Sequence, residues 1–326
     1  MSDIKLERSE INVLSKALEW HENGYRVCVI SVIKTWGSSP RPVGAIMSIN
    51  SEGLSIGSVS GGCIEDELIT KIVNNFPKSS LFLSFSSEEH KSLPCGGNVD
   101  LLVEPITNSN EWYDLLSKIK SHKNIFRIID RDNPNNCELK EEEINRDHSK
   151  ENIMINYPPP WRLLIIGSGD LSLSVFKISS LMGYNVSICD PRKEFTESWI
   201  GSNILIHRMM PDDFIIKQNC DSKTAIVALT HDPKIDDLAM IEALKTNAFY
   251  IGALGSVRTA EARQKRLIEH FEFTEEEVSK ISAPIGIDFA TKKVNEIALS
   301  VMAEITIVKN GVSVSTNRIK RKQLGN

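Results

Sequence analysis

The sequence predicts an α/β protein of two domains, a smaller N-terminal α+β domain and a C-terminal domain with a doubly wound parallel sheet. Its 326 residues suffice for two domains, each with its own core. Three consecutive prolines at 158–160 form a stiff spacer that continues neither a helix nor a sheet. Strands and helices alternate after this spacer, as in parallel sheets. We therefore place the first domain at residues 1–157 and the second at residues 161–326.

Composition narrows the class of protein and its partners. Hydrophobic residues make up 41% of the chain and charged residues 25%, and the formal net charge is -5, which is typical of soluble globular proteins and argues against nucleic acid as a partner. No signal peptide and no run of about 20 apolar residues is visible, so we expect a cytoplasmic protein without a membrane partner. The six cysteines are scattered without a close pair and do not predict a disulfide framework.

The spacing of apolar residues predicts the helices and strands of the first domain. We assign the core of this domain to residues 7–107 and a variable segment to residues 108–157. Apolar residues at helical spacing predict helices, and alternating patterns between glycine and proline turns predict strands. The expected elements are a helix at 7–22, a strand at 25–34, a loop at 35–44, a hairpin of 45–50 and 54–58, a helix at 64–76, strands at 80–86 and 99–104, a helix at 111–120, a strand at 124–130 and a loop or loose hairpin at 133–150.

A loop rich in glycine and serine, residues 57–65, is the most informative stretch of this domain. Three glycines and two serines precede Cys63, and an apolar helical pattern follows. Glycine tolerates positive φ, so successive N–H groups of the loop can line one concavity that suits an anion. The N-terminus of the following helix favours the thiolate form of Cys63. We expect the loop to hold an anionic ligand beside a reactive sulfur.

A second glycine-flanked cysteine follows at Cys95-Gly96-Gly97. Two such cysteines in one small domain suggest a shared site. A zinc site of Cys63, Cys95 and His90 is an alternative, although structural zinc sites normally use four ligands with at least one close pair. The remaining alternative is that both are ordinary turn cysteines.

The second domain begins with the pattern of a nucleotide-binding unit. A strand at 161–166, a turn containing Gly167 and Gly169, a helix, and a strand ending in Asp190 follow within 30 residues. This arrangement places a pyrophosphate on a helix N-terminus and a ribose on a carboxylate. Further strands are expected at 203–206, 224–229 and 249–251, and further helices at 236–245, 259–270 and 295–308.

Two later loops leave the predicted carboxyl ends of strands, where such sheets bind ligands. In the first, His231 and Asp232 form an acid/base or ligand-orienting pair, or Asp232 merely caps the next helix. In the second, Arg258 and Arg263 either meet a phosphate or are solvated.

Taken together, several sequence motifs of this chain closely resemble those of the XdhC/CoxI family. In the first domain they are Gly37-Ser38-Ser39-Pro40-Arg41, the 57–65 loop and Cys95-Gly96-Gly97; in the second they are Thr230-His231-Asp232, residues 250–256 and Ala283-Pro284-Ile285-Gly286. The resemblance spans nearly the whole chain except about 108–155 and the last fifteen residues. It implies a Rossmann-like second domain.

The resemblance further implies an accessory protein that binds molybdenum cofactor (molybdopterin), supports its sulfuration and inserts it into a xanthine dehydrogenase-type hydroxylase. It implies the apo-hydroxylase and a cysteine desulfurase as partners and leaves homodimer formation open. Cys63 and Cys95 would be neighbours of the molybdenum. The cofactor-binding residues implied in the first domain are Ser38, Ser39, Arg41, Ser58, Ser60, Gly61, Gly62, Cys63, Glu65, Cys95, Gly96 and Gly97.

In the second domain, Gly167, Gly169, Asp190, Gly255 and Ser256 are the expected residues for NAD(P) or another nucleotide. The alternative function is therefore an NAD(P)-dependent oxidoreductase that uses these residues for its cofactor and His231 for proton transfer. That alternative gives no role to the two cysteine loops.

Overall fold

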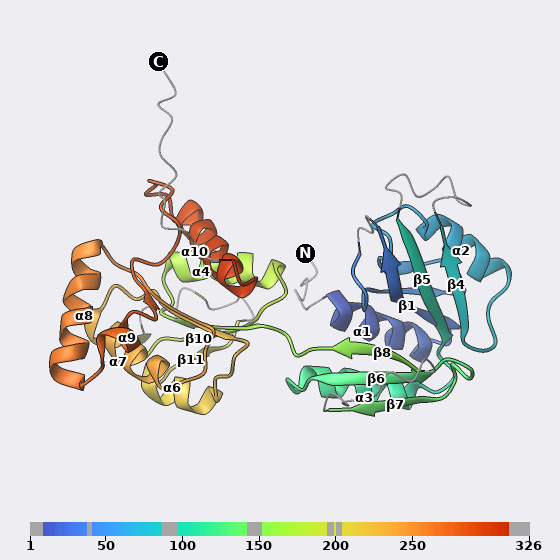
Figure 1. The fold of residues 1–326 in the computed structure, drawn as a ribbon, viewed down its shortest axis with the longest axis horizontal. Coiled ribbons are helices and arrows are strands. Elements are labelled where there is room, and N and C mark those ends of the chain that lie inside the picture. The colour runs from blue at the N-terminus through green and yellow to red at the C-terminus, as the bar shows by residue number, and fades with distance from the viewer. Residues whose placement is uncertain are drawn as a thin grey trace, which may run out of the picture. The chain divides into compact units, whose positions relative to one another are not determined.

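The structure is a computed structural model, and it describes residues 9–37, 41–86, 97–141, 152–193, 199 and 204–312. The chain divides into two compact units between Pro160 and Trp161. In Figure 1 the colours from blue to green belong to the first unit, and those from yellow-green to red belong to the second. Each unit is described by itself.

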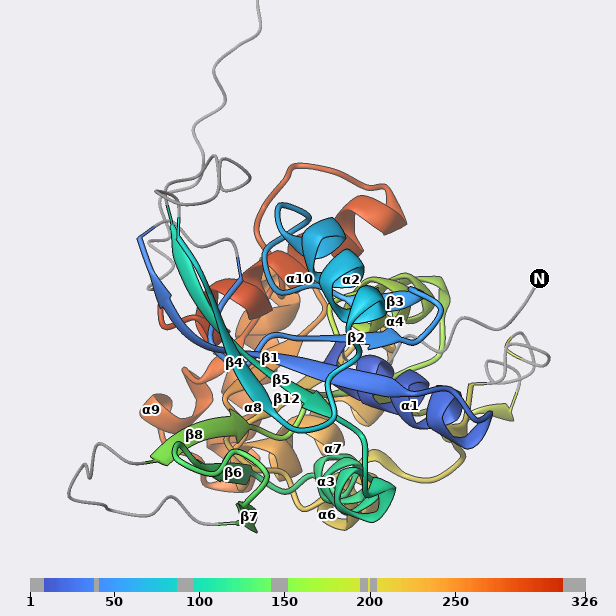
Figure 2. The same cartoon turned by 90° about the vertical axis from the view of Figure 1, so that its right-hand side faces the viewer.

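The first unit contains a five-stranded antiparallel sheet in the order β3-β2-β1-β5-β4. Its central strand β1 is also the longest, and β1, β5 and β4 lie side by side in Figure 2. The elements up to this sheet's last strand are α1 (Ser9–Glu22), β1 (Val27–Trp36), β2 (Ile46–Asn50), β3 (Ser55–Gly57), α2 (Glu65–Asn74), β4 (Leu81–Phe85) and β5 (Asn98–Pro105).

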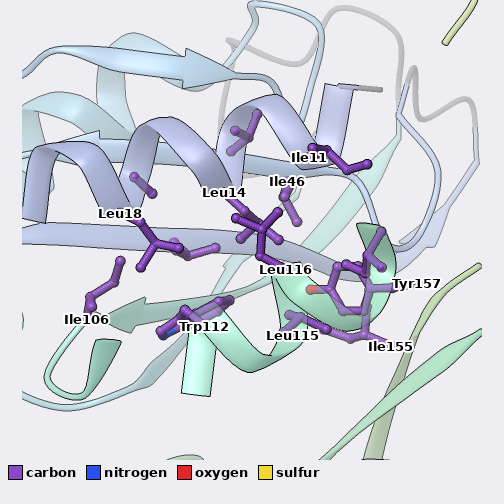
Figure 3. Close-up of a cluster of buried hydrophobic side chains, with 14 of the residues drawn as sticks. Ile11, Leu14, Leu18, Ile46, Ile106, Trp112, Leu115, Leu116, Ile155 and Tyr157 are labelled. Carbon is purple, nitrogen blue, oxygen red and sulfur yellow. The ribbon is translucent and has the colours of Figure 1, made fainter. Parts of the chain in front are cut away.

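Alternation along β1 gives this sheet two buried faces. Cys28, Ile30 and Val32 pack with Leu68 and Ile72 of α2. The intervening strand residues pack instead against α1 and α3 (Ser109–Lys120) in a second apolar cluster. Figure 3 shows part of that cluster, where side chains of α1 meet those of α3 and of the strand that ends at Tyr157. The sheet is therefore a rigid platform covered on both sides.

A small three-stranded sheet, in the order β7-β6-β8, completes the first unit. Its strands are β6 (Ile125–Asp130), β7 (Cys137–Lys140) and β8 (Asn152–Tyr157). Arg127 of β6 is buried and forms two hydrogen bonds, of 2.7 and 2.8 Å, with the carboxylate of Glu104 in β5. This ion pair ties the small sheet to the large one.

The second unit contains a six-stranded parallel sheet in the order β11-β10-β9-β12-β13-β14. Its elements are β9 (Arg162–Ile166), α4 (Asp170–Leu181), β10 (Asn185–Cys189), β11 (Ile206–His207), α6 (Pro211–Gln218), β12 (Thr224–Ala228), α7 (Pro233–Leu244), β13 (Tyr250–Ala253), α8 (Val257–Phe271), α9 (Glu275–Val278), β14 (Ile281–Ser282) and α10 (Val294–Lys309). Most begin and end close to the predicted positions, whereas α6, α9 and β14 were not predicted from the sequence.

The strand order of this unit, counted from its first strand, is that of dinucleotide-binding sheets, with a topological switch point between β9 and β12. Apolar side chains of α4 and α10 cover one face of the sheet, and those of α6 and α7 cover the other. This confirms the predicted α/β class and the doubly wound parallel sheet.

Candidate functional site

The predicted loops of the first unit meet at one end of its large sheet. β1 ends there at Trp36, and β3 ends there before the 58–64 loop. Arg41, from the loop after β1, donates a hydrogen bond from Nε to the carbonyl oxygen of Ser58 at 3.2 Å. Trp36 pairs with Asn98 at the start of β5, so buried Gly97 lies at the same end. The hairpin of β2 and β3 therefore brings the loop after β1 and the glycine-serine loop to the same end of the sheet.

The carboxylate of Glu65, the first residue of α2, organises the glycine-serine loop. Oε1 accepts hydrogen bonds from the Ser58 hydroxyl (2.7 Å) and from the N–H groups of Val59 (3.1 Å) and Ser60 (2.9 Å). Oε2 accepts from the Ser60 hydroxyl and from the N–H groups of Gly62 (2.9 Å) and Ile64 (3.2 Å). The loop is thus folded around an anion, as the glycine pattern predicted, but that anion belongs to the chain itself.

Hydrogen bonding fixes Glu65 in its charged form. Burial raises the pKa of its carboxyl, but hydrogen bonds from the Ser60 and Ser58 hydroxyls and from backbone N–H groups outweigh this and lower the pKa to about 2. The expectation that these loop amides hold an external anion therefore needs correction. Four of them donate to Glu65 and are not available to another acceptor in this conformation.

Cys63 lies at the tip of this loop, directly before the residue that precedes α2. Its N–H donates to the Ser60 hydroxyl at 3.0 Å, and Gly61 donates to the Ser58 hydroxyl at 2.8 Å. The Cys63 side chain is a free thiol and half-buried. Because Ser60 is itself held by Glu65, the carboxylate fixes the backbone that carries the sulfur.

Part of the predicted site lies outside the described residues, namely Ser38, Ser39, Cys95 and Gly96, together with His90 of the zinc alternative. The roles assigned to them stay predictions. Within the ranges that the structure describes, no group of three or more His, Cys, Asp or Glu side chains is arranged to hold a metal ion.

In the second unit, the predicted glycine turn connects β9 to α4. Gly167 has a φ of +111°, and a Cβ at this position would lie 3.1 Å from both Leu229 and Thr230, just after β12. Gly169 is the N-cap of α4. The turn therefore has the tight backbone approach that the sequence predicted.

Asp190 lies at the end of β10, where a nucleotide-binding sheet holds a ribose, but it is fully buried and already has partners. Arg192 donates to both carboxylate oxygens at 3.0 Å, and the N–H and hydroxyl of Ser168 donate at 2.9 and 3.0 Å. Burial raises the pKa of Asp190, but the hydrogen bonds from Arg192 and Ser168 and the charge of Arg192 outweigh it, so the pKa is lowered. The expected ribose contact is occupied by the chain's own side chains.

Arg192 was not among the predicted site residues. Its place two positions after an acid that ends a strand was the signal in the sequence. Trp199, also unpredicted, donates from Nε1 to the carbonyl oxygen of Ser168 at 2.6 Å. Trp199 therefore contacts the 167–170 turn directly, and Arg192 is linked to it through Asp190.

A cavity of about 360 Å³ opens at the carboxyl ends of β12 and β13, and its lining includes His231, Gly255, Ser256 and Arg263. The partner of His231 in the predicted pair, Asp232, is the N-cap of α7 and accepts from the N–H of Lys234 at 3.0 Å. Of the two alternatives for Asp232, the structure therefore shows the helix cap. His231 is exposed, with a φ of +63°.

No helix among the described residues combines the length and apolar character needed to cross a membrane.

Comparison with known proteins finds relatives of similar length. The chain is 24% identical over 301 residues to "Molybdenum cofactor insertion chaperone PaoD" of Escherichia coli, across 91% of this chain and 88% of that protein. It is 23% identical to a Bacillus subtilis protein named as a probable subunit of xanthine dehydrogenase, across 90% and 96% of the two chains. A crystal structure described as a xanthine dehydrogenase from Bacillus halodurans matches with a TM-score of 0.77 and 19% identity, across 95% and 98% of the chains, and shows the same fold.

Two family models match the two units separately. "XdhC and CoxI family" matches residues 20–77, which include β1, the hairpin, the Cys63 loop and α2. "XdhC Rossmann domain" matches residues 163–305, which include the parallel sheet. Between them they cover more than half of the chain, in the order that the sequence motifs predicted, and the chain therefore belongs to the XdhC and CoxI family.

Proposed function

We propose that this chain binds molybdenum cofactor, supports its sulfuration and inserts it into an apo-hydroxylase of the xanthine dehydrogenase type. The observation that carries the proposal is the similarity, over about nine-tenths of both chains, to a protein named as a molybdenum cofactor insertion chaperone. Similarity to a protein named as a probable part of xanthine dehydrogenase supports the choice of client. A cysteine desulfurase is the proposed partner for the sulfuration step.

The residues of the Cys63 loop fit one part of the cofactor. When bound, the cofactor supplies a soft metal–dithiolene centre, for which a thiolate is a natural neighbour. Cys63 is a half-buried free thiol held on a backbone fixed by Glu65, so its sulfur can be presented without ordering the loop at the moment of binding. Cys95 is the proposed second sulfur.

The same loop does not fit the phosphate of the cofactor in its present conformation. The N–H groups of Val59, Ser60, Gly62 and Ile64 donate to Glu65, whose charge would also repel a phosphate. We therefore propose that Glu65 shapes the loop and that the phosphate lies elsewhere at this end of the sheet. Arg41, which contacts the loop at Ser58, is the proposed cation for this phosphate.

A transfer assay tests the proposal. Chain purified with its cofactor is mixed with cofactor-free xanthine dehydrogenase, and hydroxylase activity is followed over time. We expect the wild type and the Cys220→Ser variant to restore activity and the Cys63→Ser variant to fail. Cys220 is a matched control because it is also a half-buried free thiol, but in the second unit. Equal restoration by Cys63→Ser and Cys220→Ser would contradict the role of the Cys63 loop.

A further inference from the structure

The cavity in the second unit contains a buried cation that lacks a full set of partners. Arg263 of α8 is only 2% exposed, and its Nε donates to Asp237 Oδ1 at 2.9 Å. Its Nη2 lies 3.5 Å from Asp236 Oδ2. Its Nη1 has no hydrogen-bond partner among the described residues. Nη1 itself has almost no accessible surface. A buried donor without a partner is costly, so a small turn of this guanidinium toward the cavity that Arg263 lines is favoured when an acceptor is supplied there.

The N-terminus of α8 faces the same cavity. Its N-cap is Ser256, whose hydroxyl accepts from the N–H of Thr259 at 3.2 Å, and both residues line the cavity. Gly255 before it has a φ of +154°, and a Cβ there would lie 3.1 Å from the Thr259 side chain. The first N–H groups of a helix and its dipole attract anions. Because this cap is neutral, unlike the Asp232 cap of neighbouring α7, no carboxylate of its own occupies the position.

The acidic groups around the cavity already have cationic or hydroxyl partners. Asp236 Oδ1 accepts from the Thr230 hydroxyl at 2.7 Å, and its other oxygen faces Arg263. Asp237 accepts from Arg263 and, at 2.8 Å, from Arg266. Two carboxylates are therefore balanced by two guanidinium groups. Asp232, between the lining residues His231 and Pro233, adds a third carboxylate, which is held by the N–H of Lys234 at the N-terminus of α7. The preference for an anion therefore comes from Arg263 and the partial positive charge of the α8 N-terminus, and not from the net charge around the cavity.

We propose that this cavity binds the phosphate group of a small phosphorylated ligand, with Arg263 and the N-terminus of α8 as its receptors. A phosphate offers several acceptor oxygens in a tetrahedral arrangement, which can meet a guanidinium edge and helix N–H groups together. The cavity of about 360 Å³ also has room for atoms attached to the phosphate. The site involves residues of the second unit alone and does not depend on cofactor binding at the Cys63 loop.

A pair of variants matched in shape but not in charge tests the site in the full chain. Ser256→Asn and Ser256→Asp both keep a strong N-cap, so both should fold, and they differ by one negative charge beside the cavity. Binding of inorganic phosphate, ribose 5-phosphate and acetate is measured by isothermal titration calorimetry. We expect the wild type and Ser256→Asn to bind both phosphates, and Ser256→Asp to bind them at least about tenfold more weakly.

Arg263→Lys adds an independent variant, which keeps the charge but loses the planar donors, and we expect it to weaken phosphate binding as well. Tighter binding of ribose 5-phosphate than of inorganic phosphate would identify a phosphorylated metabolite as the ligand, and the reverse order would identify free phosphate. The proposal is overturned if the wild type binds neither phosphate at millimolar concentration. It is also overturned if Ser256→Asp binds phosphate like Ser256→Asn, or if acetate binds as well as phosphate.

Discussion

Replacement of Glu65 by Gln tests whether this carboxylate organises the Cys63 loop. Each carboxylate oxygen accepts three hydrogen bonds from the loop. The Gln side chain keeps one acceptor oxygen and puts an NH₂ donor where the other oxygen was, so one set of three donors loses its partner. We expect the variant to fold with a loosened loop and a lower free energy of unfolding.

The magnitude follows from the pKa of Glu65. Its pKa is about 2 against an ordinary 4.5, and at 1.36 kcal/mol per pKa unit the charged form contributes about 3 kcal/mol. Solvent screening at this partly exposed side chain reduces the expected loss to about 1–2 kcal/mol. Because the pKa is lower in the folded chain, the contribution is complete above about pH 4.5 and is lost as the pH falls toward 2.

Urea unfolding followed by circular dichroism measures this loss, with two transitions fitted because two units need not unfold together. Asp66→Asn is the matched control, since Asp66 is an exposed acid in the same helical turn. We expect it to cost about 0.5 kcal/mol or less. If Glu65→Gln behaves like this control at pH 7, or if its loss is the same at pH 7 and near pH 2, the carboxylate does not organise the loop.

Three further experiments probe single contacts of the structure. Gly57 and Gly24 share a φ of +86°, but a Cβ on Gly57 would collide with Ile46 and lie 2.7 Å from Val13, whereas a Cβ on Gly24 would meet no atom within 4 Å. Urea unfolding should therefore show Gly57→Ala at least about 1 kcal/mol less stable than Gly24→Ala. Iodoacetamide mapping by mass spectrometry should label half-buried Cys63 before Cys28 and Cys189, which are buried with the pKa raised to about 12. Arg192→Gln removes the guanidinium from buried Asp190, and thermal unfolding near pH 7 should show a free energy of unfolding lower by about 2–4 kcal/mol. This loss should shrink below pH 3.8, the ordinary Asp pKa, as Asp190 becomes protonated. Equal losses near pH 7 and below pH 3.8 would contradict the pairing.

The parallel sheet could be predicted because its signals are local. The apolar strand at 162–166, the glycine turn and Asp190 follow one another within a single unit of strand, helix and strand. The small sheet of the first unit was missed in part because β8 pairs with β6 across an acidic, asparagine-rich segment. Asn152–Tyr157 itself alternates, with Ile153, Ile155 and Tyr157 turned inward, and this local strand signal was not included among the predicted elements.

The sites could be located from the sequence, but the partners of their charged groups could not. The glycine pattern predicted a loop that surrounds an anion, and only coordinates show that Glu65 fills it. Asp190 occupies the predicted strand end, but its pairing with Arg192 depends on how the chain turns after β10. In both cases a charged side chain close in sequence can take the hydrogen bonds that an external ligand would otherwise make. Sequence spacing alone does not tell which of the two makes them.

The most direct measurement is the molybdopterin content of the gently purified chain, determined by pterin fluorescence after oxidation and by mass spectrometry. We predict bound pterin in the wild type and in the Cys220→Ser variant, and its loss from a folded Cys63→Ser variant. Wild-type protein without pterin, or Cys63→Ser protein that retains the wild-type amount, would contradict the claim that this loop holds the cofactor.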